Sequence, residues 1–566
     1  MKRRKWSDLT KKFSFSLLIN AVLLLYFLIL FYCRFETDDD YTMKMIVSGV
    51  FGKPDCHLNF IHVFIARFLQ ALYQSLPSFP WYESLQYLLI FLSLSVMTRV
   101  LLDKERNPFY DLLVYASLFS ASHFLYVELQ FTKTAGILTL CGHMFLSYTL
   151  AKGSNKQSAF AILFLLLGIM FRKNQFMLIS LVCVALYIPF FIRALEDLKV
   201  KRINSDIMKL FLTGLLCLLC FYGLRYMDSL NYKDPAWKYY RSFNSARAAI
   251  LDRNHLDYAD DPAFYDSIGL GEIDVKMLYD CWDFEDPDVF TLEVFQAIRE
   301  HQAASKPEIL AHLSDLLNDS VSFFFNNKGH LAVFFLLLLT MVFSLTADKN
   351  QPNTLSLSLT LLTVIFAYCF CYFYRNYAIL ARTHLSICVA GLFILLYQVN
   401  VSRMKAGWKA YIVSIALLTA VMSCMWMNEF RFYSSNRLKD KRKIEAIAQI
   451  NADRDHLYLR TADEGIDFVS ELFVSQNVYM KDNLYALGGW MTNMPFLQDI
   501  REHYDAKNPF KDCVNNDKVY LLINSDDRLD MILEYIQKHY DKDAKTVFVK
   551  TIEANKTYSV YKIVSE

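Results

Sequence analysis

Long apolar runs recur along almost the whole chain, and they leave few folds open to it. The first covers residues 13–33. Several others also reach the roughly 20 residues that a helix needs to cross the core of a bilayer. Hydrophobic residues make up 54% of the 566 residues and charged residues only 20%, a balance that is unusual for a soluble domain. The sequence therefore predicts an α-helical membrane protein with several spans.

The apolar runs predict about eleven spans, and the basic residues predict how these are oriented. The spans lie near residues 13–33, 84–102, 109–128, 131–151, 158–171, 175–194, 207–226, 329–346, 354–374, 380–399 and 408–427. With the basic segment 1–12 in the cytoplasm, Lys and Arg also fall in the alternate loops that would be cytoplasmic. The run 158–171 is short, but without it the later basic loops would lie outside. We therefore expect a multi-pass protein of the cell membrane with a cytoplasmic N-terminus.

This topology places three large segments outside the membrane, and they define the domains. The segments are residues 34–83, residues 227–328 and the tail that follows residue 428. We expect one transmembrane module over residues 1–428, which includes the two outer loops. A separate extracytoplasmic domain is expected over residues 429–566.

Local patterns predict the structure of these outer segments. Residues 61–76 carry apolar side chains at helical spacing, which predicts an amphipathic helix that lies in the membrane interface or packs on the outer domain. Two segments that begin with Asp-Pro, 234–252 and 286–301, predict helices of the second loop. In the tail, alternating residues predict strands, a helix lies between two of them, and "YALGGW" (485–490) is expected to be a turn. The expected strands are 456–461, 518–524, 545–552 and 557–564, and the expected helix is 526–540. The tail is therefore predicted to be a small α/β domain.

An acidic stretch directly follows the first apolar run. It contains Glu36, Asp38, Asp39 and Asp40. Carboxylates this close together are costly to keep charged beside a membrane. One explanation is that an Asp caps a helix, because a carboxylate there satisfies free N–H groups and suits the helix dipole. A cap needs only one Asp, so the stretch is also a candidate catalytic site.

Basic residues recur at the predicted outer ends of distant spans, against the usual excess of Lys and Arg inside. They are Lys133, Arg172, Lys173, Arg375 and Arg382, and Glu128 adds an acid at such an end. A phosphate would favour these cations, because guanidinium binds it through paired hydrogen bonds. Snorkelling or contact with lipid headgroups is the alternative. Carboxylates and cations at one membrane face together suggest chemistry on a lipid-linked phosphate.

The layout of the chain resembles that of the GT-C glycosyltransferases. The first span is followed at once by an acidic motif, a membrane-parallel helix is expected in the first outer loop, and many spans precede an outer tail. The motifs "ETDDDYTMKMIVSGVFGKPDCHLNF", "FNSARAAILD" and "GGWMTNMP" are also similar to those of a large group of bacterial membrane proteins. The resemblance implies a GT-C-like fold. It also implies an enzyme that moves sugar from a polyprenyl-phosphate carrier to a cell-surface glycan or lipid acceptor, outside the membrane.

The resemblance also implies roles for the residues named above. An Asp of the first outer loop would take the acceptor's proton or orient the substrate, and we expect Asp39, then Asp38 and Asp40, with Glu36 nearby. The phosphate would be held by the basic set Arg375, Arg382, Arg172, Lys173 and Lys133. Glu128 would orient the acceptor or share a divalent ion with the Asp group. Because some enzymes of this superfamily need no metal, we expect no cofactor, and we expect inversion at the anomeric carbon.

Other functions stay open at this point. A flippase would need polar or broken helices near the bilayer midplane, a polymerase of lipid-linked glycans would use similar cations, and a sensor or scaffold would use the tail to bind a partner. No stretch beyond the first dozen residues is basic enough to suggest nucleic acid. A metal site at Asp55, His57 and His62 is not favoured, because the two histidines do not share a helix face. Convergence of the acids and the arginines on one cavity would favour the enzyme.

Overall fold

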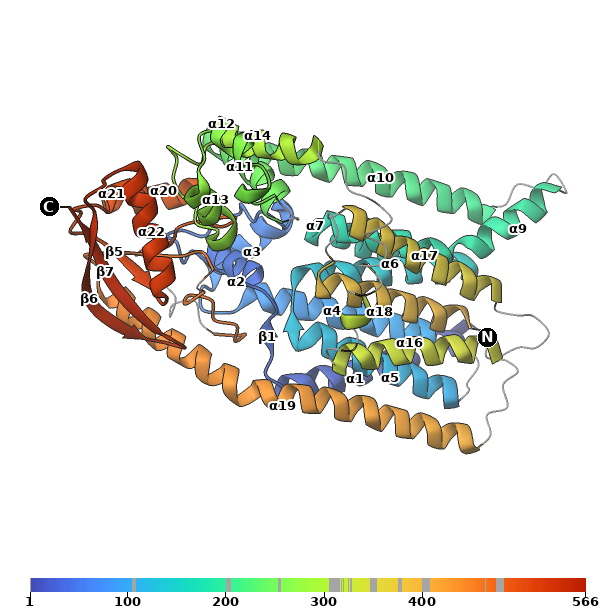
Figure 1. The fold of residues 1–566 in the computed structure, drawn as a ribbon. Coiled ribbons are helices and arrows are strands. Elements are labelled where there is room, and N and C mark those ends of the chain that lie inside the picture. Colours follow the sequence, from blue (N-terminus) through green and yellow to red (C-terminus); the bar gives the residue numbers. More distant parts are fainter. Residues whose placement is uncertain are drawn as a thin grey trace.

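The protein consists of a bundle of long helices, a middle lobe of shorter helices and a C-terminal α/β domain, arranged along one axis (Figure 1). The structure is a computed structural model. It describes residues 2–103, 108–199, 205–252, 256–304, 316, 318, 320–323, 325, 328–346, 354–374, 379–399, 408–463, 465–474 and 483–565.

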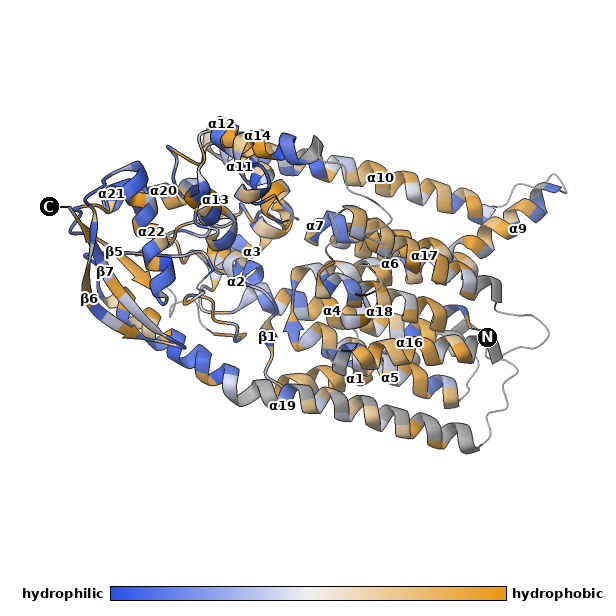
Figure 2. Ribbon diagram, in the orientation of Figure 1, coloured by the Kyte–Doolittle hydropathy of each residue, from blue (hydrophilic) through white to orange (hydrophobic). Residues whose placement is uncertain are grey.

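A helix occupies each predicted apolar run. These helices are α1 (Lys2–Leu30), α4 (Trp81–Leu101), α5 (Pro108–Tyr126), α6 (Phe131–Lys152), α7 (Asn155–Phe171), α8 (Lys173–Cys183), α9 (Ile188–Lys199), α10 (Ser205–Asn231), α16 (Lys328–Thr346), α17 (Thr354–Tyr374), α18 (Ala381–Gln398) and α19 (Trp408–Ala452). In the described residues, five segments are long and apolar enough to cross a membrane: Phe13–Leu30, Trp81–Leu101, Phe131–Lys152, Ser205–Asn231 and Ala381–Gln398. Apolar residues dominate the bundle, and polar residues dominate the other two parts (Figure 2). The bundle is therefore compatible with a membrane protein, while the number of spans and their orientation stay predictions.

One predicted span differs from a straight helix. The run near 175–194 is divided into α8 and α9 by a short 3₁₀ segment, η1 (Val184–Leu186). The two halves are bent by 48°. Together, α8 and α9 are long and apolar enough to cross a membrane, but only as one bent span.

Small residues allow close packing at the centre of the bundle. A side chain at Gly168 would place its Cβ 2.5 Å from Thr139 Oγ1, and one at Gly142 would meet Leu165 at 2.7 Å. Because both glycines lack a side chain, α6 and α7 pack tightly along their length. This packing fixes the N-terminus of α6 relative to the end of α7, and both contribute to the site described below.

The middle lobe confirms two of the predicted helices and corrects a third. It contains α2 (Asp38–Ser48), α3 (Val63–Ser75), α11 (Pro235–Leu251), η2 (Tyr258–Asp260), α12 (Pro262–Ser267), α13 (Glu272–Lys276), the π-helical turn η3 (Met277–Cys281) and α14 (Leu292–Ala304). The amphipathic helix expected over 61–76 is α3, which buries Ile65 and Leu69 and exposes Phe64 and Phe68. The first Asp-Pro helix is α11, capped by the side chain of Asp234.

The second Asp-Pro segment contains a helix, but the helix does not start at the Asp-Pro, so the predicted start is wrong. The carboxylate of Asp286 is buried and accepts hydrogen bonds from Tyr535, Tyr540 and Asn508 of the C-terminal domain. It also accepts from the backbone N–H of Asp288, which forms a turn. Because these bonds hold the chain in a turn, α14 begins only at Leu292.

The C-terminal domain contains a mixed five-stranded sheet, as its α/β prediction requires. Its strands are β3 (Leu457–Arg460), β4 (Leu484–Ala486), β5 (Val519–Ile523), β6 (Lys545–Glu553) and β7 (Thr557–Val564), and its helices are α20 (Pro495–His503), α21 (Pro509–Asp512) and α22 (Asp526–His539). The strand order is β4-β3-β5-β7-β6; β3 pairs parallel with β4 and β5, and β7 pairs antiparallel with β5 and β6. The start of the predicted turn 485–490 belongs to β4, which pairs through Tyr485 and Ala486.

The long helix α19 joins the bundle to this domain. It runs for 45 residues without a break, so the domain boundary predicted after residue 428 falls inside it. Beside it, Arg34–Phe35 (β1) and Glu128–Leu129 (β2) form a two-stranded parallel sheet at the end of the bundle. The acidic stretch follows β1 directly and lies where all three parts of the protein meet.

Candidate active site

The acidic motif forms the first turn of α2. Thr37 is the N-cap residue with extended backbone, and Asp38, Asp39 and Asp40 follow it. Three carboxylates at this position are favoured by the free N–H groups and by the helix dipole. The capping explanation thus accounts for where the residues lie, but not for their different surroundings.

Asp40 is fully buried and ties α2 to the bundle. Its Oδ1 accepts hydrogen bonds from Tyr82 Oη at 2.8 Å, Gln86 Nε2 at 3.3 Å and the backbone N of Phe131 at 3.0 Å. Burial raises the pKa of Asp40 to about 8, although these three donors lower it. Such a group suits the positioning of α2 rather than contact with a substrate.

Asp39 is half-buried and lies within electrostatic reach of two predicted phosphate-binding residues. Burial raises the pKa of Asp39 to about 6, and the neighbouring Asp38 carboxylate raises it further. Arg382 and Arg172 act in the opposite direction, because a nearby cation favours the charged carboxylate. The structure therefore brings together three residues that lie far apart in the sequence.

Asp38 faces the C-terminal domain. Its side chain is exposed, although neighbouring protein atoms partly desolvate the carboxylate. This desolvation raises the pKa of Asp38, Asp467 raises it further, and Arg460 lowers it. Arg460 and Asp467 themselves form an ion pair of 2.8 Å. The C-terminal domain thus contributes directly to the surroundings of the acidic motif.

Arg172 and Arg382 line one cavity of about 380 Å³ in the bundle. One wall is apolar and comes from α8 and α17, with Met177, Leu178, Leu181, Phe366 and Phe370. Gln175 also lines the cavity, and its side-chain N–H₂ is buried without a hydrogen-bond partner in the described part of the chain. An apolar wall with cationic and amide donors at one end suits an anion that carries a lipid chain.

The polar end of this cavity coincides with the start of three helices. Thr132 belongs to the first turn of α6, Arg172 is the N-cap residue of α8, and Arg382 is the second residue of α18. Helix N-termini carry partial positive charge, which favours bound anions. Within the described residues, no side chain caps α8 or α18. At α6 the first N–H groups already donate to Asp40 and to the side chain of Gln130. The backbone and the arginines therefore act in the same direction.

Three other predicted residues belong to an ion-pair network beside β1 and β2. Lys133 is buried, and its Nζ lies 2.9 Å from Glu36 and 3.8 Å from Glu128. Glu128 also pairs with Arg34, which in turn pairs with Glu429 at 2.9 Å. The cations lower the pKa of Glu128 to about 2, against the effect of its burial. These contacts account for Lys133, Glu128 and Glu36 without a substrate.

The remaining predicted residues lie elsewhere. Lys173 is exposed and lines a second, smaller pocket next to the cavity, to which Arg172 also contributes. Arg375 lies outside the described residues. The acids and arginines thus converge for Asp39, Arg172 and Arg382, while Lys173 and Lys133 have other surroundings.

All three motifs that carry the resemblance reach this region. Asp252, at the end of "FNSARAAILD", raises the pKa of Asp39 through its charge. Trp490, in "GGWMTNMP", packs on Phe60 at 5.1 Å, and the guanidinium of Arg172 lies 4.7 Å from the same Phe60 ring. Because Asp252 ends one of these motifs, its position in the sequence could have indicated that it lies near the acidic stretch. Nothing local in the sequence singles out Arg460, Asp467 or Gln175.

The potential metal ligands Asp55, Cys56 and His57 lie together, with one donor atom of each within 4.8 Å of the others. The ring of His57 is already engaged, because Nδ1 lies 2.7 Å from Asp55 Oδ1 and Nε2 lies 3.1 Å from the carbonyl oxygen of Asn231. His62 is not part of the group: it caps α3 through Nδ1 and donates from Nε2 to the carbonyl of Leu224. The arrangement fits a structural role for both histidines.

Comparison with models of known protein families finds no match, and comparison with curated proteins finds no match either.

Proposed function

We propose that the protein is a membrane glycosyltransferase of the GT-C type. It would move a sugar from a polyprenyl-phosphate carrier to a cell-surface glycan or lipid acceptor on the outer face of the membrane. The proposal includes the topology of about eleven spans that the apolar runs predict. The surroundings of Asp39 support it most strongly, because they combine a carboxylate with two arginines that line a partly apolar cavity.

In the proposed reaction, Asp39 takes a proton from the acceptor hydroxyl. The acceptor oxygen then forms a bond to the anomeric carbon of the sugar, and the bond from that carbon to the carrier phosphate breaks. A pKa of about 6 leaves the carboxylate largely ionised at neutral pH and still basic enough to accept a proton. Asp38 would bind or orient the acceptor, and Asp40 would hold α2 in place.

The leaving group is the carrier phosphate, whose negative charge grows as the bond breaks. Arg172 and Arg382 would stabilise this charge, helped by the N-termini of α8 and α18. The carrier chain would lie along the apolar wall formed by α8 and α17. Lys133 and Glu128 would position β1 and β2 rather than touch the substrate, because they already pair with each other and with Glu36 and Arg34.

The experiment replaces Asp39 by Asn in a strain that lacks the natural gene, with lipid-linked sugar measured by mass spectrometry. A deletion strain should accumulate the donor, and D39N should fail to clear it, with transfer reduced by about 10²–10⁴-fold. D234N is a matched control, because Asn caps α11 about as well as Asp. The proposal fails if D38N, D39N and D40N all restore normal levels.

A further inference from the structure

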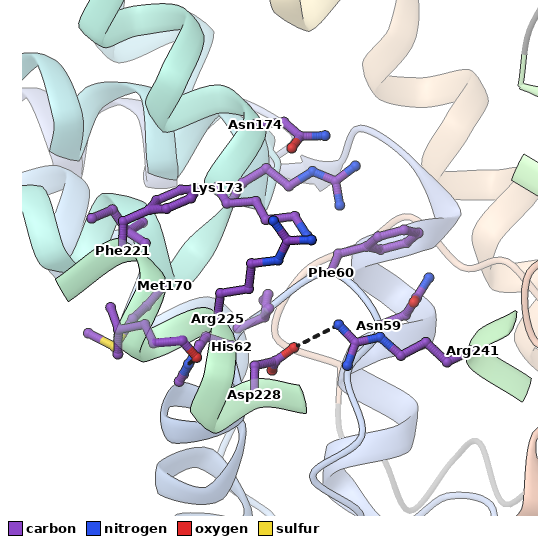
Figure 3. Close-up of a pocket in the computed structure, with 14 residues that line it drawn as sticks. Asn59, Phe60, His62, Met170, Lys173, Asn174, Phe221, Arg225, Asp228 and Arg241 are labelled. Atoms are coloured by element: carbon purple, nitrogen blue, oxygen red, sulfur yellow. Dashed lines mark hydrogen bonds and ion pairs between the residues drawn. The ribbon is translucent and has the colours of Figure 1, made fainter. Parts of the chain in front are cut away.

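The second pocket next to the cavity contains an unusual excess of positive charge. It has a volume of about 90 Å³ and is lined by Arg172, Lys173, Arg225 and Arg241, with Asp228 as the acid among them. Figure 3 shows the side chains of Lys173, Arg225 and Arg241 entering the same space from α8, α10 and α11. The volume corresponds to about three water molecules, which suits a compact anion rather than a sugar.

Among the described residues, little of the charge of Lys173, Arg225 and Arg241 is neutralised. Asp228 Oδ2 lies 3.5 Å from Arg241, and its Oδ1 already accepts a hydrogen bond from the backbone N of Val63. Lys173 and Arg225 form no hydrogen bond or ion pair within the part of the chain that the structure describes. Lys173 also lies within electrostatic reach of Arg225, Arg241 and Arg172, so like charges repel one another there. An anion in the pocket would remove this repulsion.

Polar groups of the right kind surround the cations. Asn59 and Asn174 line the pocket and carry N–H₂ donors. Phe221, Leu224 and Met170 form its apolar side. Phe221 and Leu224 belong to α10, a candidate span without a buried residue. The pocket therefore lies near one end of a helix whose side chains are all half-buried or exposed, where a lipid headgroup would be found.

We propose that Lys173, Arg225 and Arg241, with Asn59 and Asn174, bind a phosphate group at a site separate from the cavity that Arg382 lines. A phosphate matches the site because it carries up to two negative charges and accepts several hydrogen bonds at once. Arg172 borders both sites. The inference does not rest on the proposed sugar transfer, because binding here requires no reaction.

The test uses Lys173 as a local reporter, since its side chain is exposed and an amine-reactive reagent can label it. The full-length protein in a neutral detergent is labelled alone, with inorganic phosphate, with micelles containing phosphatidic acid and with micelles containing phosphatidylcholine. Peptide mass spectrometry then gives the labelling rate of Lys173. We expect inorganic phosphate or phosphatidic acid to slow it at least tenfold relative to phosphatidylcholine.

Variants show whether the pocket is responsible. R225Q should weaken the protection of Lys173 by roughly tenfold. The double variant R225Q/R241Q, which lacks two cations, should weaken it by roughly tenfold again. The matched variant K233Q/K238Q loses two exposed cations outside the pocket and should be protected like the natural protein.

The two ligand arms identify the source of the phosphate. Protection by phosphatidic acid alone assigns a lipid headgroup, and protection by both ligands assigns the phosphate group itself. The inference is overturned if neither ligand protects Lys173, or if R225Q/R241Q is protected as well as the natural protein. D39N should lose sugar transfer and keep this protection, so a failure of the proposed function and a failure of this inference give different results.

Discussion

At the scale of single residues, three adjacent aspartates have three different surroundings. Asp40 is enclosed by hydrogen-bond donors of α4 and α6, Asp39 lies within reach of two arginines, and Asp38 faces the C-terminal domain. Successive residues of a helix point in directions about 100° apart. Three neighbours in one turn can therefore serve a structural, a catalytic and an orienting role.

The pH dependence of the proposed reaction tests the role of Asp39. Its pKa is raised to about 6, and only the ionised form can accept a proton. We expect kcat/KM to be half-maximal near pH 6 and to fall about tenfold for each pH unit below that. Initial rates of sugar transfer between acid and neutral pH measure this acid limb of the pH–rate profile.

The same limb should move when Arg382 is changed. R382Q removes a cation that favours the ionised carboxylate, so the pKa of Asp39 should rise and the limb should shift upward by roughly one pH unit. The position of the limb is read separately from the maximal rate, which R382Q should also lower. R193Q, an exposed change in α9, should leave the limb in place. A limb that stays at the same pH in R382Q would contradict the assignment.

At the scale of elements, a buried ion pair holds α2 against α4. Lys44 Nζ lies 2.7 Å from Glu83 Oε1, and both side chains are almost inaccessible to solvent. The pair also binds the C-terminal domain, because Lys44 donates to the carbonyl of Val474 and Glu83 Oε1 accepts from the backbone N of Phe473. This one ion pair thus links the helix that carries the aspartates to two neighbours, in addition to the contacts of Asp40 with α4 and of Tyr41 with Phe468.

Breaking this pair on one side should be costly. K44M leaves the Glu83 carboxylate buried without its cation, and we expect a loss of about 3–5 kcal/mol in the free energy of unfolding. The double variant K44M/E83L should recover much of this loss, because no buried charge is left without a partner. Thermal unfolding in detergent measures both, with the exposed change K53M as control. Equal unfolding midpoints for K44M and K53M would contradict the prediction.

At the scale of the whole molecule, all three parts of the protein contribute to the site. The loop 465–474 of the C-terminal domain runs against the acidic segment: the backbone N of Phe35 donates to the carbonyl of Ser470 at 2.8 Å, and Tyr41 packs on Phe468. The middle lobe and the C-terminal domain also meet where the backbone N of Glu285 donates to the carbonyl of Leu487. The C-terminal domain is therefore part of the site and not a detached module.

The junction at Leu487 leaves no room for a side chain on the next residue. A Cβ at Gly488 would lie 1.9 Å from the carbonyl oxygen of Trp282 and 3.1 Å from the backbone N of Phe284. Because backbone atoms cannot rotate away, G488A should cost at least about 1–3 kcal/mol and separate the two parts. G214A adds the same atom in open space on α10 and should be neutral or slightly stabilising. Unfolding midpoints and limited proteolysis compare the two variants, and equal behaviour would contradict the prediction.

Much of the secondary structure follows from local pattern. The apolar runs, the amphipathic segment of α3 and the strand patterns of the tail are each visible within a few residues. The alternation expected of the strands matches burial best in β7, whereas β5 is buried at every position. The Asp-Pro segment at Asp286 misled the prediction. The local signal for a helix start is real, but tyrosines some 250 residues later bind the carboxylate and hold a turn.

In the candidate site, too, local sequence patterns predict some features and contacts between distant segments decide the others. Apolar run length, charge placement and the acidic motif identify Asp39, Arg172 and Arg382 as candidates, because ionisable groups are rare and costly at a membrane boundary. Their convergence depends on how α2, α6, α8 and α18 pack. The same packing places Lys133 in a structural ion-pair network, Lys173 in a separate pocket, and Arg460 and Asp467 next to Asp38. Burial and charge pairing come from contacts between distant segments, so no local pattern records them, and they decide which of the charged residues can meet a substrate.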